Sequence, residues 1–380
     1  MSMRFPSKEL IWHYYKYKGK KDIISSFWGK KGLYIEWKYF NGYSENFKYL
    51  ICYTYPDPDK ELKLLPPEVY IRVYRPEKEI VYNHKTFPDS KIDWDTKKSI
   101  DIRYDVNNFV DQIDDEGNEI RLCGKLDNVS WDLTYKRDKL DLVHKFKNLD
   151  LSTEIFGYSL RKIFSQTMNW QIIMPKAKIT GYLKIDNDIY NINEIEDLRG
   201  YIDSNWGKWI PIDPMWKWGQ CSGVTKNGKT YALLTGDIKN RENRGQIYVE
   251  ISPHLIIFDK SKKLKNGKKQ YKIEAGNWYK DTKTGILIPM HHEIEANNAK
   301  QSLKVITNTK YYDVFPIEIP SPIAPDFYVI QMHVNYTGEV YENGNKILDI
   351  NSEGFMEHTG LNYKNIPQKV INSIKKIFGN

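Results

Sequence analysis

The chain has 380 residues, of which 40% are hydrophobic and 14% are aromatic, and its formal net charge is +8. This length is more than one ordinary hydrophobic core accommodates, so we expect two domains. The hydrophobic content excludes a disordered or fibrous chain. The cations are dispersed and no recognisable reader module accompanies them, which argues against a nucleic-acid-binding protein.

The start of the sequence and its cysteines bear on location. Residues 1–10 contain cations without a following apolar run, so no secretory signal peptide is predicted. No apolar run reaches the roughly eighteen residues that a membrane-spanning helix needs. Cys52, Cys123 and Cys221 are scattered without metal or redox spacing. We therefore expect free thiols in a reducing compartment and a cytoplasmic protein.

Strand patterns recur along the whole chain. Apolar runs that alternate or are short predict strands at residues 32–37, 69–74, 248–251, 327–334 and 346–350. Asn-Gly pairs, a strong hairpin signal, begin at Asn41, Asn227, Asn266 and Asn343. Antiparallel meanders avoid exposed edges by closing into barrels. Phosphate-binding loops, dinucleotide fingerprints and βαβ alternation are absent, so we expect an all-β fold and no nucleotide cofactor.

Two segments suggest contacts at the periphery. Val370, Ile374 and Ile377 follow Pro367 at one-face spacing and predict a short C-terminal helix. This helix either seals a barrel or touches a membrane through its flanking lysines. The basic run at residues 262–269 predicts a solvated hairpin tip, and the alternative is a contact with phosphate or with an anionic membrane surface.

Three groups of motifs carry a resemblance to a known family. They are Glu-Trp-Lys-Tyr-Phe-Asn-Gly at 36–42; Pro-Lys-Ala-Lys-Ile-Thr-Gly at 175–181, Gly-Tyr-Ile-Asp-Ser-Asn-Trp-Gly at 200–207 and Trp-Lys-Trp at 216–218; and Tyr-Thr-Gly at 336–338, Asn-Gly at 343–344 and Gly-Phe-Met-Glu-His-Thr-Gly at 354–360. Together these resemble the lipocalin-like family that includes the carotenoid hydratases (hydroxyneurosporene synthase) and, more distantly, fungal lipocalin-like Diels–Alderases. That family opens with a Glu-Trp-Trp-Tyr-Phe-type strand, carries Gly-Tyr-x-Asp-His-x-Trp-Gly in the middle and closes with Gly-Tyr-x-Glu-x-Thr-Gly.

The resemblance implies two fused lipocalin-like antiparallel β-barrels, at residues 1–210 and 211–380, with the terminal helix in the second. It also implies a cofactor-independent enzyme that hydrates, cyclises or isomerises an isoprenoid- or polyene-like molecule in an apolar pocket. Such chemistry needs a proton donor and aromatic faces for a developing cation. Ser204 stands where the family has histidine, and serine cannot pass a proton near neutral pH as imidazole can.

Individual residues follow from these motifs. Asp203 is the first candidate acid, and its alternative role is a carboxylate that pins a turn by accepting backbone hydrogen bonds. Asp237 is the second candidate acid, and its alternative role is a surface ion pair with Lys239, Arg241 or Arg244. The candidate substrate-binding residues are Asn205, Trp206, Trp216, Trp218, Gln220 and His358. Trp216, Trp218 and Gln220 are two positions apart, so an extended segment places them on one face.

The histidines at 291 and 292 alternate faces in a strand and lack a third ligand at a usual spacing, so no metal site is predicted. The expected partner is a hydrophobic small molecule, while the oligomeric state is left open. A non-catalytic lipid or pigment carrier is the alternative to the enzyme, and the loss of histidine at Ser204 favours it. A scaffold that binds proteins through an exposed apolar patch is a third hypothesis.

Overall fold

The computed structural model describes much of the chain, and the strands within the described residues form two compact units. The described residues are 34–56, 66–75, 78–88, 101–113, 118–137, 149–150, 153–154, 165–166, 169–208, 215–239, 244–251, 254–260, 262, 264, 267, 269–317 and 326–362. The predicted C-terminal helix at Val370, Ile374 and Ile377 lies outside them.

The first unit holds most of the strands that precede residue 209. Their bounds are β1 (Tyr34–Tyr43), β2 (Lys48–Pro56), β3 (Glu68–Tyr74), β4 (Val81–Thr86), β5 (Asp101–Arg103), β6 (Phe109–Gln112), β7 (Glu119–Leu126), β8 (Val129–Arg137), β9 (Leu149–Asp150), β12 (Asn169–Ile185), β13 (Asp188–Asn191) and β14 (Arg199–Lys208), with a single 3-10 turn, η3 (Ile192–Glu194), among the described residues.

The second unit holds the remaining strands, including the short hairpin strands β10 and β11 that precede β12 in the chain. Their bounds are β10 (Thr153–Glu154), β11 (Ser165–Gln166), β15 (Met215–Val224), β16 (Thr230–Lys239), β17 (Arg244–Ile251), β18 (His254–Asp259), β19 (Tyr271–Lys280), β20 (Leu287–Asn297), β21 (Gln301–Ile317), β22 (Asp326–Glu342) and β23 (Asn345–Asn362).

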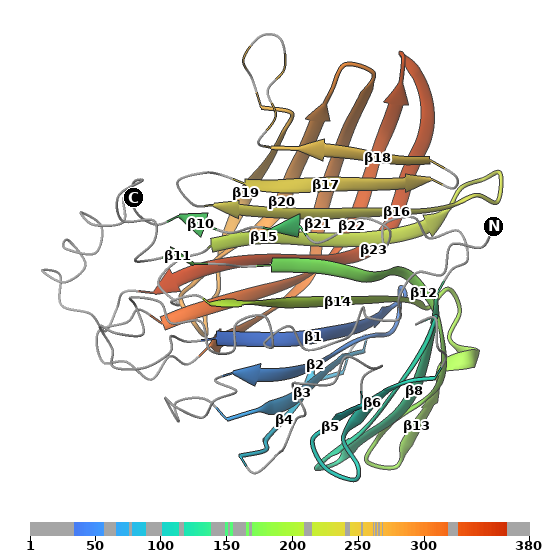
Figure 1. Cartoon of the computed structure of the whole chain (residues 1–380), viewed down its shortest axis with the longest axis vertical. Coiled ribbons are helices and arrows are strands. Elements are labelled where there is room, and N and C mark those ends of the chain that lie inside the picture. The colour runs from blue at the N-terminus through green and yellow to red at the C-terminus, as the bar shows by residue number, and fades with distance from the viewer. Residues whose placement is uncertain are drawn as a thin grey trace, which may run out of the picture. The chain divides into compact units, whose positions relative to one another are not determined.

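Each unit is built around one curled antiparallel sheet (Figure 1). In unit 1 the order is β4-β3-β2-β1-β14-β12-β8-β7-β6-β5, and Asn83 of β4 donates to the Leu126 carbonyl of β7 at 2.9 Å. In unit 2 the order is β18-β17-β16-β15-β23-β22-β21-β20-β19, and the Tyr271 hydroxyl of β19 donates to the Gly236 carbonyl of β16 at 3.1 Å. These bonds join strands far apart in the sheet order, so each sheet curls back toward itself. The prediction of an all-β, antiparallel chain is confirmed.

A separate apolar core lies on the concave side of each sheet. Strand β8 shows why: its residues alternate between buried Val129, Trp131, Leu133 and Tyr135 and more exposed polar positions. Period-two alternation turns every second side chain toward the same side. The unit 1 core contains residues from Phe40 to Ile202, and the unit 2 core contains residues from Cys221 to Met356. We call the side of each sheet that carries this core the core side.

The Asn-Gly pairs differ in outcome. Asn343 and Gly344 both have positive φ, 50° and 80°, and connect β22 to β23 as predicted. The pair at Asn41 was expected to form a turn, and this is wrong because both residues lie inside β1. A Cβ on Gly42 would come within 2.5 Å of the Tyr49 ring, so this glycine provides room for an aromatic side chain.

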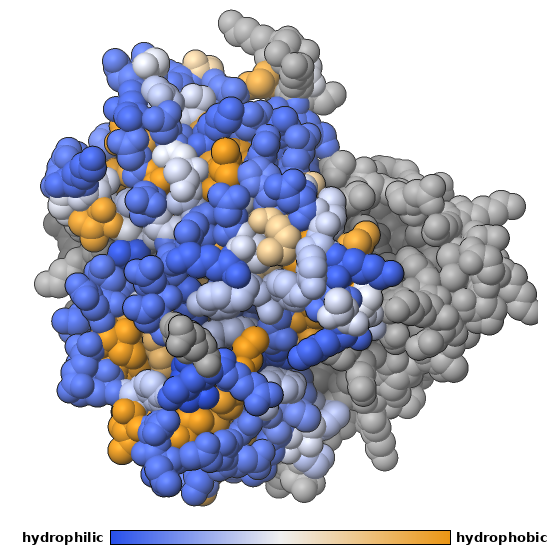
Figure 2. All heavy atoms as spheres, turned by 180° about the vertical axis from the view of Figure 1, so that it is seen from behind, coloured by the Kyte–Doolittle hydropathy of each residue, from blue (hydrophilic) through white to orange (hydrophobic). Residues whose placement is uncertain are grey.

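The surface is mainly hydrophilic on the face that Figure 2 draws, where hydrophobic side chains form small separated patches within the coloured, described part. Exposed large apolar residues include Trp278, Tyr279 and Leu287. None of the helices among the described residues has the length and apolar character needed to cross a membrane.

Candidate active site

The two sides of strand β14 carry different chemistry. Ile202 belongs to the unit 1 core, so Ser204 and Trp206 share the core side with it. Asp203 and Asn205 project to the opposite side, yet Asp203 is only 3% exposed. The structure thus brings Asp203 and Asn205 together and places Trp206 on the other side of the sheet from them.

Asp203 accepts hydrogen bonds from three side chains. Its Oδ2 atom accepts from the Tyr201 hydroxyl at 2.8 Å and from Trp170 Nε1 at 2.9 Å. Its Oδ1 atom accepts from Asn205 Nδ2 at 2.9 Å. Trp170 reaches this position because β12 pairs with β14 in a register that sets Trp170 opposite Asn205. Tyr39 of β1, which lies opposite Asp203, completes the cluster with its ring edge-on to Tyr201 at 6.3 Å between centroids.

The carboxyl of Asp203 holds a proton more tightly than an ordinary aspartate. Burial raises the pKa of Asp203 to about 7, and the hydrogen bonds from Tyr201, Trp170 and Asn205 limit that rise. Desolvation disfavours the charged form, whereas donated hydrogen bonds favour it. Near neutral pH the group is therefore close to half protonated. Oδ1 has a single hydrogen bond from the described residues and can carry the proton.

On the core side, two positions that depart from the family pattern meet. Lys38 stands where the family that the motifs resemble has the second tryptophan of its opening strand, and Ser204 stands where that family has histidine. The two residues are in register between β1 and β14, and Lys38 Nζ donates to Ser204 Oγ at 2.6 Å. Lys38 Nζ also pairs with Glu36 Oε1 at 2.7 Å, and both side chains are fully buried. Sequence reasoning missed this pair, since Lys38 was a motif letter without an assigned role.

Unit 2 places three predicted substrate-binding residues in one row. Trp216, Trp218 and Gln220 lie on the side of β15 opposite the core, because Cys221, the residue after Gln220, belongs to the core and successive side chains alternate sides. Trp216 Nε1 donates to Glu357 Oε2 at 3.2 Å, and Gln331 donates to the other oxygen of that carboxylate at 3.2 Å. The row is thus tied to the closing-motif glutamate of β23.

The other two predicted residues of unit 2 lie on its core side. Asp237 pairs with Lys260 at 2.5 Å, and both side chains are largely buried. His358 is half-buried and pairs in register with Lys217 of β15. Neither shares a side of the sheet with Trp218 or Gln220. This ion pair supports the alternative role of Asp237, a salt bridge instead of a catalytic acid. Its partner, Lys260, is not one of the cations close to Asp237 in the sequence.

Two residues that donate hydrogen bonds to Asp203 were not among the site residues predicted from the sequence. Tyr201 belongs to the same motif as Asp203 but received no role, although its spacing of two from Asp203 places both on one side of a strand. Trp170 carried no signal, because it lies 33 residues away in sequence and its position depends on strand register.

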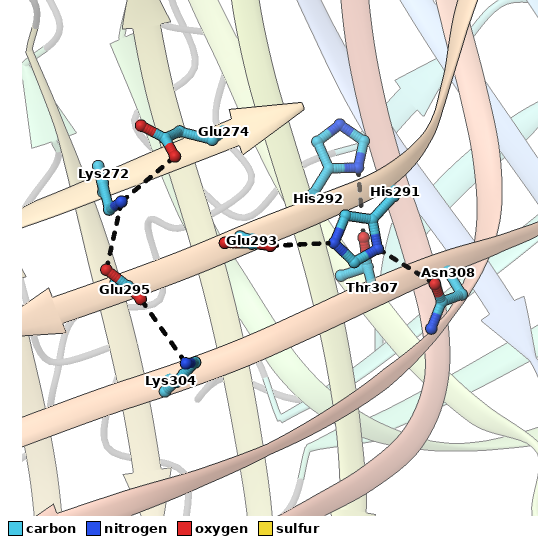
Figure 3. A network of polar contacts seen from close by, with 9 residues as sticks. All are labelled: Lys272, Glu274, His291, His292, Glu293, Glu295, Lys304, Thr307 and Asn308. Atoms are coloured by element: carbon cyan, nitrogen blue, oxygen red, sulfur yellow. Dashed lines mark hydrogen bonds and ion pairs between the residues drawn. The ribbon is translucent and has the colours of Figure 1, made fainter. Parts of the chain in front are cut away.

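The described residues contain no group of three or more His, Cys, Asp or Glu side chains arranged to hold a metal ion. His291 and His292 project to opposite sides of β20 and so do not face one another across a common site (Figure 3).

No family model and no curated protein matches the chain. Its fold is similar to that of NE1406 from Nitrosomonas europaea, a candidate AttH, with a TM-score of 0.56, 13% identity, and 95% of this chain and 99% of that chain covered. For CghA the TM-score is 0.58 at 10% identity, with 87% and 88% covered. For kievitone hydratase from Nectria haematococca it is 0.51 at 12% identity, with 94% and 98% covered. These similarities confirm the predicted lipocalin-like fold.

Proposed function

We propose that the chain is a cofactor-independent enzyme that hydrates or cyclises a hydrophobic small molecule, with Asp203 as the proton donor. The observation that carries this proposal is a buried carboxyl whose pKa lies near 7, held by Tyr201, Trp170 and Asn205. A general acid works best when its pKa is close to the operating pH. An ordinary aspartate, with a pKa near 4, is ionised at neutral pH and has no proton to give.

The proposed reaction begins with transfer of the Asp203 proton to an alkene carbon. The alkene π electrons form the new C–H bond, which leaves a carbocation on the neighbouring carbon and a carboxylate on Asp203. Tyr201, Trp170 and Asn205 then stabilise that carboxylate through the hydrogen bonds they already donate. The π faces of nearby aromatic rings stabilise the cation.

The cation has two productive outcomes. In hydration, water adds to it and the resulting oxonium loses a proton, which can return to Asp203. In cyclisation, a second alkene of the same molecule attacks the cation and a proton is then lost from the ring product. Both outcomes regenerate the protonated acid without a redox cofactor.

The fold similarity to kievitone hydratase, a hydratase by name, supports the reaction class. The motif resemblance to carotenoid hydratases supports an isoprenoid or polyene as the substrate. The free buried cysteines Cys52, Cys123 and Cys221 support a reducing, cytoplasmic setting.

The test measures deuterium transfer in heavy water. Purified protein is incubated with lycopene or with a prenylated phenol, and products are analysed by mass spectrometry and NMR. We expect one deuterium at the newly formed C–H bond, and an Asp203→Asn variant should be slower by about a hundredfold or more. Asp237→Asn is the matched control, because its carboxyl is paired with Lys260 in the other unit.

A non-catalytic carrier is the second candidate, and the hydroxyl of Ser204 at the family's histidine position favours it. Organic extraction of gently purified protein separates the two. A polyene that co-purifies, stays unchanged on prolonged incubation and binds equally to Asp203→Asn would establish the carrier and refute the enzyme.

A further inference from the structure

The hairpin formed by β19 and β20 ends in apolar side chains that face the solvent. Trp278, Tyr279 and Leu287 are 48%, 44% and 55% exposed. Lys280 follows the two rings and pairs in register with Leu287, so these two side chains are neighbours on the same side of the hairpin. We call residues 278–287 the hairpin end. Its exposed apolar surface has no part in the proposed reaction.

The charges at the hairpin end differ from those on the rest of the two strands. Farther along, Lys272 Nζ contacts Glu274 at 3.2 Å and Glu295 at 3.3 Å, so cations and acids alternate there (Figure 3). Lys280 and Lys283, in contrast, are exposed and form no ion pair with any residue in the described ranges. Both positive charges are therefore available to an anionic partner.

The acid within the hairpin end, Asp281, is turned inward. It is 8% exposed, and its Oδ2 atom accepts from the backbone N–H of Thr284 at 2.7 Å and from Thr284 Oγ1 at 2.6 Å. Its Oδ1 atom accepts from the Tyr312 hydroxyl at 2.9 Å. Asp281 therefore stabilises the turn and presents little negative charge to the solvent.

The turn itself is fixed. The Asp281 N–H donates to the Ile286 carbonyl and the Gly285 N–H donates to the Asp281 carbonyl, both at 2.8 Å, while Gly285 has a φ of +71°. Ile286 packs against the core of unit 2, and the Trp278 ring lies edge-on to His358 at 5.5 Å. The exposed side chains are thus held at the surface and cannot fold back into the core.

We propose that the hairpin end docks reversibly on an anionic phospholipid bilayer. Trp and Tyr rings have an apolar body and a polar edge, and they favour the head-group region of a membrane. Lys280 and Lys283 complement the negative charge of anionic head groups. A protein partner fits less well, because three apolar side chains are far fewer than the roughly 20–30 residues a side of a stable interface. The docking rests on the hairpin alone and does not depend on the proposed reaction.

Flotation of the full chain with lipid vesicles tests this docking. We expect binding to vesicles of phosphatidylcholine with an equal amount of phosphatidylglycerol to be at least about tenfold tighter than to phosphatidylcholine alone, and to weaken as salt is added. The double variant Lys280→Gln with Lys283→Gln should weaken binding by roughly twentyfold, since each lysine near an anionic surface contributes roughly fivefold. Trp278→Ser should weaken it by about tenfold, because the ring no longer enters the head-group region.

The hairpin of β15 and β16 provides a matched control, because Val224 is 57% exposed and Lys226 beside it is also exposed. Leu287→Ser with Lys283→Gln changes one apolar and one cationic side chain at the hairpin end, and Val224→Ser with Lys226→Gln makes the same kind of change at the other hairpin. We expect the first pair to weaken binding by about tenfold and the second to leave it unchanged. Equal weakening would show that the net charge of +8 attracts the chain without a specific contact, and would overturn the proposal.

Tryptophan fluorescence gives a readout that a general effect of charge would not move. Brominated phosphatidylcholine in the mixed vesicles quenches rings that enter the bilayer, so the parent protein should be quenched more than Trp278→Phe. Asp203→Asn should dock as the parent protein does, so the docking and the proposed reaction are tested separately. Equal quenching of the parent and Trp278→Phe, or equal affinity for the two kinds of vesicle, would overturn the proposal.

Discussion

At the scale of single residues, the proton affinity of Asp203 couples catalysis to stability. The folded state holds this proton up to about pH 7, whereas an unfolded aspartate releases it near pH 4. Between these values the native state binds more protons than the unfolded state. The free energy of unfolding must therefore fall as pH rises through this window.

The first prediction is that Asp203→Asn removes this slope. Between pH 4 and pH 7 the free energy of unfolding of the parent protein should fall by up to about 4 kcal/mol more than that of the variant, because the variant has no proton to release at this position. Urea denaturation of both proteins across this range measures the difference, in which the contributions of other carboxyls cancel. Parallel curves would contradict the raised pKa.

The second prediction concerns the buried pair of Glu36 and Lys38. Lys38→Met leaves the Glu36 carboxylate without its counter-ion in a fully buried position, so it should destabilise the protein by about 3–5 kcal/mol. The double variant Glu36→Leu with Lys38→Met removes both charges and should recover most of that loss. Urea denaturation measures both effects. Lys272→Met, at an exposed ion pair, is the control and should leave stability nearly unchanged.

The sequence motif was enough to identify Asp203 as a candidate acid, but it did not indicate which side chains surround it. Its burial and its bond to Trp170 depend on the pairing of β12 with β14, which contains two register shifts between Ile172 and Ala177. Local alternation does not encode such irregularities, so neither the partner nor the pKa could be derived from the sequence.

At the scale of strands, the alternation pattern predicted most of what was observed. Residues 69–74 lie in β3 and residues 346–350 lie in β23, as predicted. Their β-branched and aromatic side chains fit a pleated surface with one buried face better than they fit a helix or a loop. Asn41 misled the prediction, since an Asn-Gly pair is a turn signal only where the chain is free to turn. In β1 it is paired with Leu50 on one side and Tyr201 on the other.

The third prediction tests a glycine that β12 requires. Gly181 has φ of +114°, and a Cβ there would come within 2.0 Å of the Asp132 carbonyl oxygen of β8. Gly181→Ala must therefore displace backbone, and it should destabilise unit 1 by about 3 kcal/mol or more. Gly360→Ala is the control, because no atom lies within 4 Å of its added Cβ. Thermal unfolding of both variants decides the matter, and equal midpoints would contradict the packing argument.

At the scale of the whole molecule, each unit carries its own core, and this arrangement has a measurable consequence. Length alone indicated two domains. It could not indicate that β10 and β11, which precede β12 in the chain, belong to unit 2 whereas β12 belongs to unit 1. Membership of a unit is decided by contacts, which a linear pattern does not contain.

The fourth prediction is that matched core variants act on different units. Leu133 and Leu233 are both fully buried, one in each core, so Leu→Ala at either should cost about 2–5 kcal/mol through lost burial and a residual cavity. In hydrogen exchange, Leu133→Ala should weaken protection of β7, β8 and β12, whereas Leu233→Ala should weaken β15, β16 and β17. Each variant thus serves as the control for the other. Equal loss of protection in both units from either change would show that the two cores unfold as one cooperative body.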